Sequence, residues 1–243
     1  MNGILGLTSA VLCGIARAAM AAEPAAQTPK RTVYAWFPRD MNNWETKAID
    51  WGALTHLSLR AVVLNADGTV SPGPQTTPER IKALVDEAHQ HGVKVTVLAW
   101  GTNANGSSTY LAQHAEQTVQ ALLDFVKANG LDGVNIDDET WHKDNSVTKG
   151  PNRELVTAFF KLLHDKFKAA RADYHLSWAS PPVISAEDKY GEAWPDYKAV
   201  AEYLDAFTVM TYCMCPPSIG WTGSSQAIAG GGKVGNHARD YST

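Results

Sequence analysis

The chain has 243 residues, a formal net charge of −4, 44% hydrophobic residues and 19% charged residues. That length allows one sizeable hydrophobic core, and a single α/β barrel is commonly about this long. Because nucleic acids and anionic membranes favour a basic surface, the slightly acidic balance gives no reason to expect either as a partner. The eight tryptophans and eight tyrosines serve packing or, alternatively, line a groove in which flat apolar faces of a ligand can stack.

The N-terminal segment is typical of an export signal. An apolar run from Ile4 to Ile15 is followed by small residues, and Ala19 to Ala21 fit an A-x-A cleavage pattern. The run is too short to span a bilayer as a helix. We therefore predict a signal peptide over residues 1–22 and a linker over residues 23–30, and we expect a secreted or periplasmic protein.

From residue 31 onward, short β-branched or aromatic runs alternate with amphipathic runs. Strands are predicted at 32–37, 54–64, 93–100, 131–139, 175–182 and 206–212, and helices at 78–92, 108–129, 152–172 and 194–205. In the first helix, Pro78 lies in the first turn and Gly92 ends the apolar period. Repeated strand-then-helix units predict a parallel sheet, because crossovers through a helix favour parallel neighbours.

Two arrangements fit such a sheet: an open doubly wound sheet and a closed (β/α)8 TIM barrel. No G-x-G-x-x-G sequence follows the first strand, which removes the main local support for a dinucleotide site. About six βα units are visible where a closed barrel has eight, and the residues after Tyr212 show neither an apolar period nor a final helix. We therefore predict an α/β fold of the (β/α)8 TIM-barrel type over residues 31–243, incomplete at its C-terminal end.

The stretch GLDGVNIDDETWH is polar, yet its first half alternates like a strand. Because side chains change face at every residue of a strand, Asn135, Asp137 and Glu139 share one face, successively about 6.6 Å apart. The apolar Val134 and Ile136 face the other way, towards the covering helices. Two further acids have that opposite parity: Asp132 and Asp138. In a barrel the polar face is the interior, and it ends at the mouth where barrel enzymes keep their active sites.

Three kinds of site could place such residues on one face of a strand: a metal site, a solvated strand end and an acid catalyst. A metal site would use Asp137, Glu139 and His142, but E-x-x-H aligns its ligands only on a helix, so we predict no metal. A solvated strand end accounts for the acids but not for three polar side chains on one face. Acid catalysis remains, because the charge of Asp137 raises the proton affinity of Glu139 while Asn135 orients Asp137 without adding charge.

These residues resemble a known family. DGVNIDDE, residues 132–139, resembles the D-G-x-D-x-D-x-E signature on the fourth strand of glycoside hydrolase family 18, the chitinase family, with Glu139 at the terminal acid. VMTY, residues 209–212, resembles the M-T-Y-D of the sixth strand. The order and spacing of these pieces agree from about Val33 to Tyr212, so the resemblance identifies residues 31–243 as a catalytic domain of this family.

The resemblance implies retaining hydrolysis assisted by the substrate. In that mechanism Glu139 protonates the leaving oxygen, and the 2-acetamido oxygen of the substrate attacks the anomeric carbon. Asp137 orients the acetamide nitrogen, and the hydroxyl of Tyr212 hydrogen-bonds the acetamide oxygen. The substrate must therefore carry N-acetylglucosamine or a close relative, and neither a metal nor an organic cofactor is required.

The sequence departs from the family pattern at several positions. Asn135 replaces the first aspartate of the D-x-D-x-E core, LAWG at 98–101 keeps only the last glycine of S-x-G-G, and Cys213 replaces the aspartate after the sixth-strand tyrosine. Beside the three catalytic residues, the candidate substrate contacts are Asn135, Met210, Trp36, Trp100, Trp141 and Trp178. Each tryptophan either stacks on a sugar ring or serves packing.

The favoured hypothesis is an exported, monomeric glycosidase that cleaves β-1,4-linked N-acetylglucosamine polymers, chitin or chito-oligosaccharides first. A peptidoglycan or N-glycan endo-β-N-acetylglucosaminidase is the alternative within the same class. The alternative from another class is a carbohydrate-binding lectin on the same scaffold with lost or weak catalysis. The retained Glu139 argues against the lectin, because family lectins commonly lose that acid.

Overall fold

The computed structural model describes residues 31–37, 46–73, 76–101, 108–138, 141, 148, 152–180 and 195–210. The chain divides into two units, residues 1–31 and 32–243. Of the first unit only Arg31 is described, so the predicted signal peptide and linker lie outside the described residues. Among the helices that are described, none is both long enough and apolar enough to cross a membrane.

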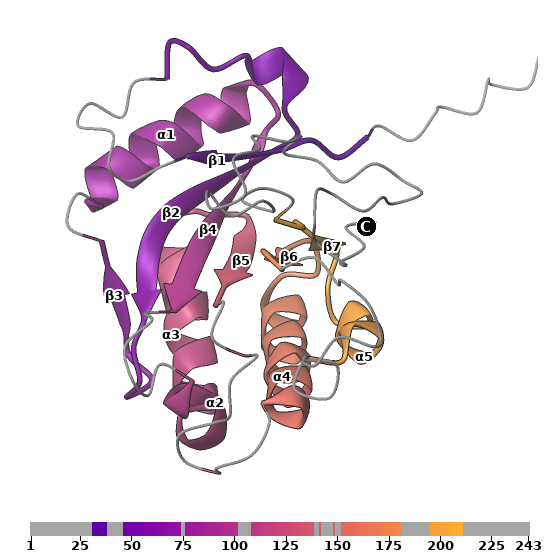
Figure 1. The fold of residues 1–243 in the computed structure, drawn as a ribbon. Coiled ribbons are helices and arrows are strands. Elements are labelled where there is room, and N and C mark those ends of the chain that lie inside the picture. The colour runs from indigo at the N-terminus through magenta and orange to yellow at the C-terminus, as the bar shows by residue number, and fades with distance from the viewer. Residues whose placement is uncertain are drawn as a thin grey trace, which may run out of the picture. The chain divides into compact units, whose positions relative to one another are not determined.

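The second unit is built on one mostly parallel sheet (Figure 1). In the described part of the chain, its parallel strands follow the order β1-β2-β4-β5-β6-β7. They are β1 (Tyr34–Phe37), β2 (His56–Leu64), β4 (Lys94–Gly101), β5 (Gly133–Asp137), β6 (His175–Trp178) and β7 (Ala206–Phe207). The short strand β3 (Val70–Pro72), which the sequence pattern did not predict, pairs with β2 in antiparallel fashion. The predicted parallel sheet of consecutive βα units is therefore confirmed.

The helices lie between successive parallel strands. They are the short 3-10 helix η1 (Trp51–Ala53), α1 (Pro78–Gln90), α2 (Thr109–Gln113), α3 (Ala115–Ala128), α4 (Arg153–Ala170) and α5 (Tyr197–Ala201). Helix α1 begins as predicted, because Thr77 accepts a hydrogen bond from the Arg80 amide and Pro78 occupies the first turn.

The prediction of one continuous helix over 108–129 is wrong, because the backbone leaves the helical conformation at His114 (φ −134°, ψ 16°). The turn between β2 and β3 contacts the chain at this point. A Cβ atom placed on Gly68 would lie 2.5 Å from the Cβ of His114, and the Gly68 carbonyl accepts a hydrogen bond from the Thr118 hydroxyl. The break at His114 therefore lies where the turn packs against the helical segment, a tertiary contact that helical periodicity does not report.

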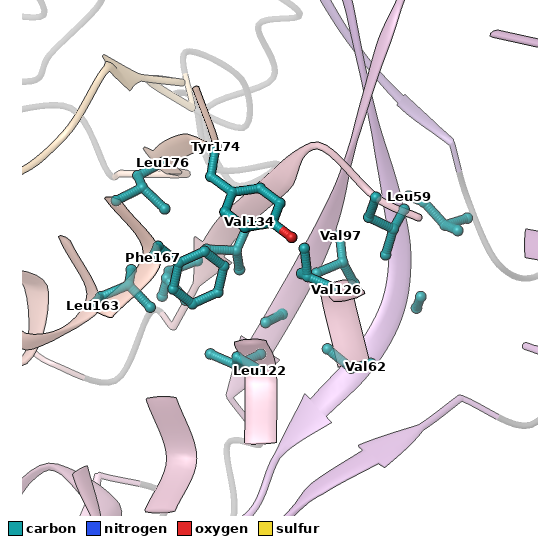
Figure 2. Close-up of a cluster of buried hydrophobic side chains, with 14 of the residues drawn as sticks. Leu59, Val62, Val97, Leu122, Val126, Val134, Leu163, Phe167, Tyr174 and Leu176 are labelled. Carbon is teal, nitrogen blue, oxygen red and sulfur yellow. The ribbon is translucent and has the colours of Figure 1, made fainter. Parts of the chain in front are cut away.

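The part of the hydrophobic core drawn in Figure 2 lies between the sheet and helices α3 and α4. From β5 it receives Val134 and Ile136, both fully buried, as the alternation along this strand predicted. Opposite the strands, the two helices contribute residues at helical spacing. These residues are Leu122 and Val126 from α3, and Leu163 and Phe167 from α4. Burial of this apolar face fixes which side of each strand points away from the helices.

The sheet is strongly curled. The hydroxyl of Tyr34 on β1 donates a hydrogen bond to the hydroxyl of Ser177 on β6 over 3.3 Å. These strands are four positions apart in the sheet, which is about 19 Å in a flat sheet. Side chains from such distant strands can meet only if the sheet closes round its non-helical face. The described strands therefore form part of a (β/α)8 TIM barrel, with Tyr34 and Ser177 in its interior.

Candidate active site

The interior face of β5 holds the polar residues that the alternation predicted. Asn135 and Asp137 lie opposite Leu98 and Trp100 of β4, and parallel pairing keeps partners on one face of the sheet. Asn135 lies at the middle of β5, and Asp137 is its last residue, at the carboxyl end where barrel enzymes bind their substrates. The structure therefore brings Asn135 and Asp137 to the barrel interior, and Asp137 is the half-buried one nearer the mouth.

Asn135 is fully buried and links two strands. Its side-chain amide donates a hydrogen bond to the Thr208 hydroxyl over 3.2 Å, directly after β7. Within the described part of the chain its carbonyl oxygen has no hydrogen-bond partner. An ionised aspartate at this position could only accept a hydrogen bond from the Thr208 hydroxyl, because a carboxylate has no donor, whereas the asparagine amide donates one.

Met210 lies on the same side as Thr208 and is buried. The backbone ladder continues past β7, because the amides of Thr208 and Met210 donate to the carbonyls of Trp178 and Ser180. This extension agrees with the predicted strand as far as Met210. The other two catalytic candidates, Glu139 and Tyr212, lie outside the described residues, and so does His142. Their roles stay predictions.

The four candidate tryptophans divide into two pairs. Trp36 on β1 is 42% exposed, and Trp100 on β4 is half-buried, and both lie on the interior face by their strand parity. Trp141 and Trp178 are each only 1% exposed and lie 5.4 Å apart, ring centroid to ring centroid. Trp178 belongs to the helix-facing parity of β6, opposite Ile136. The structure thus assigns Trp141 and Trp178 to packing, and only Trp36 and Trp100 remain candidate sugar contacts.

Arg60 is an interior residue that the sequence reasoning did not single out. It lies on β2 opposite Leu98, and its guanidinium carbon is 4.8 Å from the centroid of the Trp100 ring. This separation is that of a cation–π contact. The alternation of His56, Ser58 and Arg60 along β2 is the signal that could have placed it in the interior. Arg60 gives the region around Trp100 a positive charge.

The amino-terminal end of the interior contains a buried aromatic and polar cluster. The Tyr34 ring stacks on His56 at 4.7 Å, and the His56 and His175 ring centroids are 4.4 Å apart. Burial lowers the pKa of His175 to about 4, and the neighbouring His56 acts in the same direction. Burial also lowers the pKa of His56, with Lys94 adding to this effect. Both rings are therefore neutral at pH 7.

Asp132, the first residue of the DGVNIDDE stretch, lies before β5, at the end of the sheet opposite to Asp137. Its carboxylate accepts a hydrogen bond from the Val95 amide over 2.8 Å and contacts His89 Nε2 at 2.6 Å and Arg171 at 3.2 Å. It therefore joins α1, β4 and the end of α4. This acid is structural, in agreement with its parity opposite to that of Asp137.

Comparison with known proteins gives the same fold and a family. The profile of glycosyl hydrolases family 18 matches residues 32–238. A chitinase-like effector from Moniliophthora perniciosa is 26% identical over 141 residues, covering 55% of this chain and 31% of that protein. A chitinase structure from Rhizomucor miehei matches with a TM-score of 0.60 at 25% identity, over 76% of this chain and 58% of that chain.

Two more distant structures share the fold. A group IV chitinase from Ostrinia furnacalis matches with a TM-score of 0.65 at 19% identity, over 86% of this chain and 58% of that chain. The spore cortex-lytic enzyme of Bacillus cereus matches with a TM-score of 0.59 at 20% identity, over 77% of this chain and 43% of that chain. The chain thus spans between 43% and 58% of the length of these three solved structures. The profile match extends over most of the chain and includes the DGVNIDDE stretch, so the chain belongs to glycosyl hydrolases family 18.

Proposed function

We propose that the chain acts as a retaining glycosidase on polymers of β-1,4-linked N-acetylglucosamine, with chitin and its oligomers as the first substrates. The observation that supports this proposal is the position of Asp137. It is the last residue of a barrel strand and lies on the interior face. Glu139 follows two positions later in the sequence. A glycosidase of this family needs a carboxylate at the position of Asp137 to hold the 2-acetamido group of the substrate.

The proposed reaction has two steps. In the first, the acetamide oxygen forms a bond to the anomeric carbon, the bond from that carbon to the leaving oxygen breaks, and Glu139 gives its proton to the leaving oxygen. Asp137 stabilises the positive charge that develops on the acetamide nitrogen, and the Tyr212 hydroxyl holds the acetamide oxygen. In the second, water attacks the anomeric carbon, the bond from that carbon to the acetamide oxygen breaks, and Glu139 takes back a proton from the attacking water. The anomeric configuration is retained because two inversions occur.

Burial makes the neighbourhood of Asp137 suited to this chemistry. The interior residues below it, Asn135 and Ser177, are fully buried, so the inner side of the half-buried carboxylate is shielded from water. The charge of Asp137 favours the protonated form of Glu139 until the reaction begins. Asn135 is neutral, so one carboxylate rather than two faces the acetamide group from these two positions of β5.

Among the alternatives, a peptidoglycan substrate is favoured by one specific observation. Arg60 places a guanidinium on the interior face, stacked on Trp100. In peptidoglycan, the lactyl group on every second sugar is linked to a peptide stem that bears carboxylates, which such a cation can bind, whereas chitin carries no acidic group. We therefore propose peptidoglycan as the second candidate substrate. Export of the chain by its predicted signal peptide would bring it to either polymer, both of which lie outside the cytoplasm.

The test is hydrolysis of a chromogenic N-acetylglucosamine oligomer by the wild type and by Glu139→Gln. We expect Glu139→Gln to lose at least about a thousandfold in kcat, because it removes the proton donor, and to keep its oligomer affinity within about threefold. Glu154→Gln is the matched control, because Glu154 is an exposed glutamate on α4. If the wild type turns over neither chitin oligomers nor peptidoglycan, the glycosidase proposal fails. Binding without turnover would instead support the lectin.

A further inference from the structure

Three buried side chains form a hydrogen-bonded chain directly beside the candidate active site. Tyr110 on α2 donates its hydroxyl proton to the carboxylate of Asp138 over 2.9 Å. The indole N–H of Trp141 donates to the Tyr110 oxygen over 3.2 Å. Each of the three residues is at most 1% exposed. A single phenol therefore holds two residues of the segment that follows β5.

The charge of Asp138 makes this contact strong. A buried carboxylate is stable only when hydrogen bonds replace the water it has lost, and a phenol donor supplies one of them. Burial raises the pKa of Tyr110 well above its ordinary value, and the negative charge of Asp138 raises it further. The phenol therefore keeps its proton at every pH in which a glycosidase works, and it remains a donor throughout.

Steric contacts leave Asp138 and Trp141 little freedom. Gly101, the last residue of β4, lies so close to Asp138 that an added Cβ atom would lie 2.5 Å from the carboxylate carbon. On the other side of the segment, the Trp141 ring packs edge-on against Phe160 with ring centroids 5.5 Å apart. The side chains at both positions are thus held by packing as well as by Tyr110.

The covalent chain turns these contacts into a constraint on catalysis. Glu139 is joined to Asp138 by one peptide bond, and Trp141 is two residues further on. Consecutive Cα atoms are 3.8 Å apart, so fixing residues 138 and 141 limits where the intervening pair can lie. From this arrangement, and on the basis of the proposed function, we propose that Tyr110 is a positioning residue that holds the general-acid segment through Asp138 and Trp141.

The test compares Tyr110→Phe, which deletes only the hydroxyl, with Tyr174→Phe. Tyr174 is a matched control, since it is also a buried tyrosine but packs on Phe167, away from the segment. Hydrogen–deuterium exchange of peptides that contain residues 138–141 is measured on the full chain by mass spectrometry. We expect at least about fivefold faster exchange in Tyr110→Phe, which is the effect of losing one buried hydrogen bond, and no change in Tyr174→Phe.

Steady-state kinetics on an N-acetylglucosamine oligomer give the second measurement. We expect kcat of Tyr110→Phe to fall about tenfold, with KM within twofold and the pH profile shifted, because a misplaced acid transfers its proton poorly. Trp141→Phe, which loses the indole donor together with part of the buried ring, should also show faster exchange and a lower kcat. It also serves as the test variant if Tyr110→Phe does not fold.

Two results overturn the proposal. One is unchanged exchange in the folded variant, and the other is faster exchange with wild-type kcat. A wild-type chain that turns over no substrate overturns the proposed function instead, and the exchange result then decides alone whether Tyr110 holds the segment. Circular dichroism at the assay temperature establishes that each variant is folded.

Discussion

The imidazole rings of His56 and His175 lie with their centroids 4.4 Å apart, although their strands are three positions apart in the sheet. The curl of the sheet brings them together at the end of the barrel interior opposite to Asp137. Within the described residues, the Nε2 atom of each ring has no hydrogen-bond partner. Protonation of either ring would place a positive charge in the interior, close to the other ring and to Lys94, and the negative charge of Asp205 offsets this cost only in part.

This relationship predicts a fall in stability in acid. The pKa of His175 is lowered to about 4 by burial and by His56, so between pH 6.5 and 4 the unfolded chain binds more protons than the folded chain. The contribution of His175 to the free energy of unfolding is fully present above pH 6.5 and is lost as the pH falls towards 4. We expect a loss of roughly 2 kcal/mol, allowing for partial solvent screening.

Urea denaturation at pH 7.5 and pH 4.5 measures this loss. His175→Gln should flatten the pH dependence in that interval, because its amide does not titrate. His164→Gln is the control, since His164 lies on the outward part of α4 beside Asp165. An equally steep pH dependence in His175→Gln would show that other groups account for the acid sensitivity.

Asn135→Asp should have the opposite pH dependence of stability, because the new carboxyl group would lie in the interior near the candidate active site. The new carboxyl group would be fully buried and near Asp137, and both conditions raise its pKa above that of the unfolded chain. Its protonated form can donate to Thr208 and be tolerated, so the variant loses stability as the pH rises through the raised pKa. We expect the loss in free energy of unfolding, variant against wild type, to be roughly 1 to 2 kcal/mol larger at pH 8 than at pH 5. Equal costs at the two pH values, measured by urea denaturation, would contradict this.

Gly133 is expected to tolerate no side chain. Its φ is 151°, and a Cβ atom there would lie 1.9 Å from the carbonyl oxygen of His175, which is backbone and cannot rotate away. Gly133→Ala should destabilise the fold by at least about 4 kcal/mol or prevent folding. Gly130→Ala is the matched control. It also has a positive φ, 64°, but no neighbouring atom within 4 Å, so its cost should be about 1 kcal/mol. Thermal denaturation of both variants decides this.

Asp132 should contribute to stability and not to chemistry. Asp132→Asn weakens its contacts with His89 and Arg171, and we expect a loss of about 2 kcal/mol in the free energy of unfolding with kcat unchanged. Asp86→Asn removes an exposed carboxylate paired with Lys82 on α1 and should cost under about 0.5 kcal/mol. A loss of kcat in folded Asp132→Asn protein would argue against a purely structural acid.

Trp36→Ala should weaken substrate binding without destabilising the fold. The ring is 42% exposed on the interior side, so its removal leaves no cavity and takes away a flat surface for a sugar ring. We expect oligomer affinity to fall about fivefold with little change in melting temperature. Trp178→Ala should do the opposite, costing about 3 to 5 kcal/mol of stability because that ring is buried. Isothermal titration calorimetry and thermal denaturation of both variants separate binding from packing.

Residue alternation and helical periodicity, read from the sequence alone, determined the parallel βα order and the face of β5 that carries Asn135 and Asp137. Both depend only on the direction in which successive side chains point. The tertiary structure decided what depends on contacts between distant segments. It separated Trp36 and Trp100 from the packing pair Trp141 and Trp178, and it broke the predicted helix at His114.

The GLDGVNIDDETWH stretch shows the same division. Its sequence separated the acids by strand parity, but parity does not tell which residues of other elements each acid contacts. Asp132 joins three elements at one end of the sheet, and Asp138 binds Tyr110, whose helix lies between β4 and β5 in sequence. A hydrogen bond between residues 28 positions apart leaves no periodic mark on the chain, because it depends on how the chain closes on itself. The sequence therefore determined which face carries the candidate catalytic residues, and only the fold decided which contacts hold that face in place.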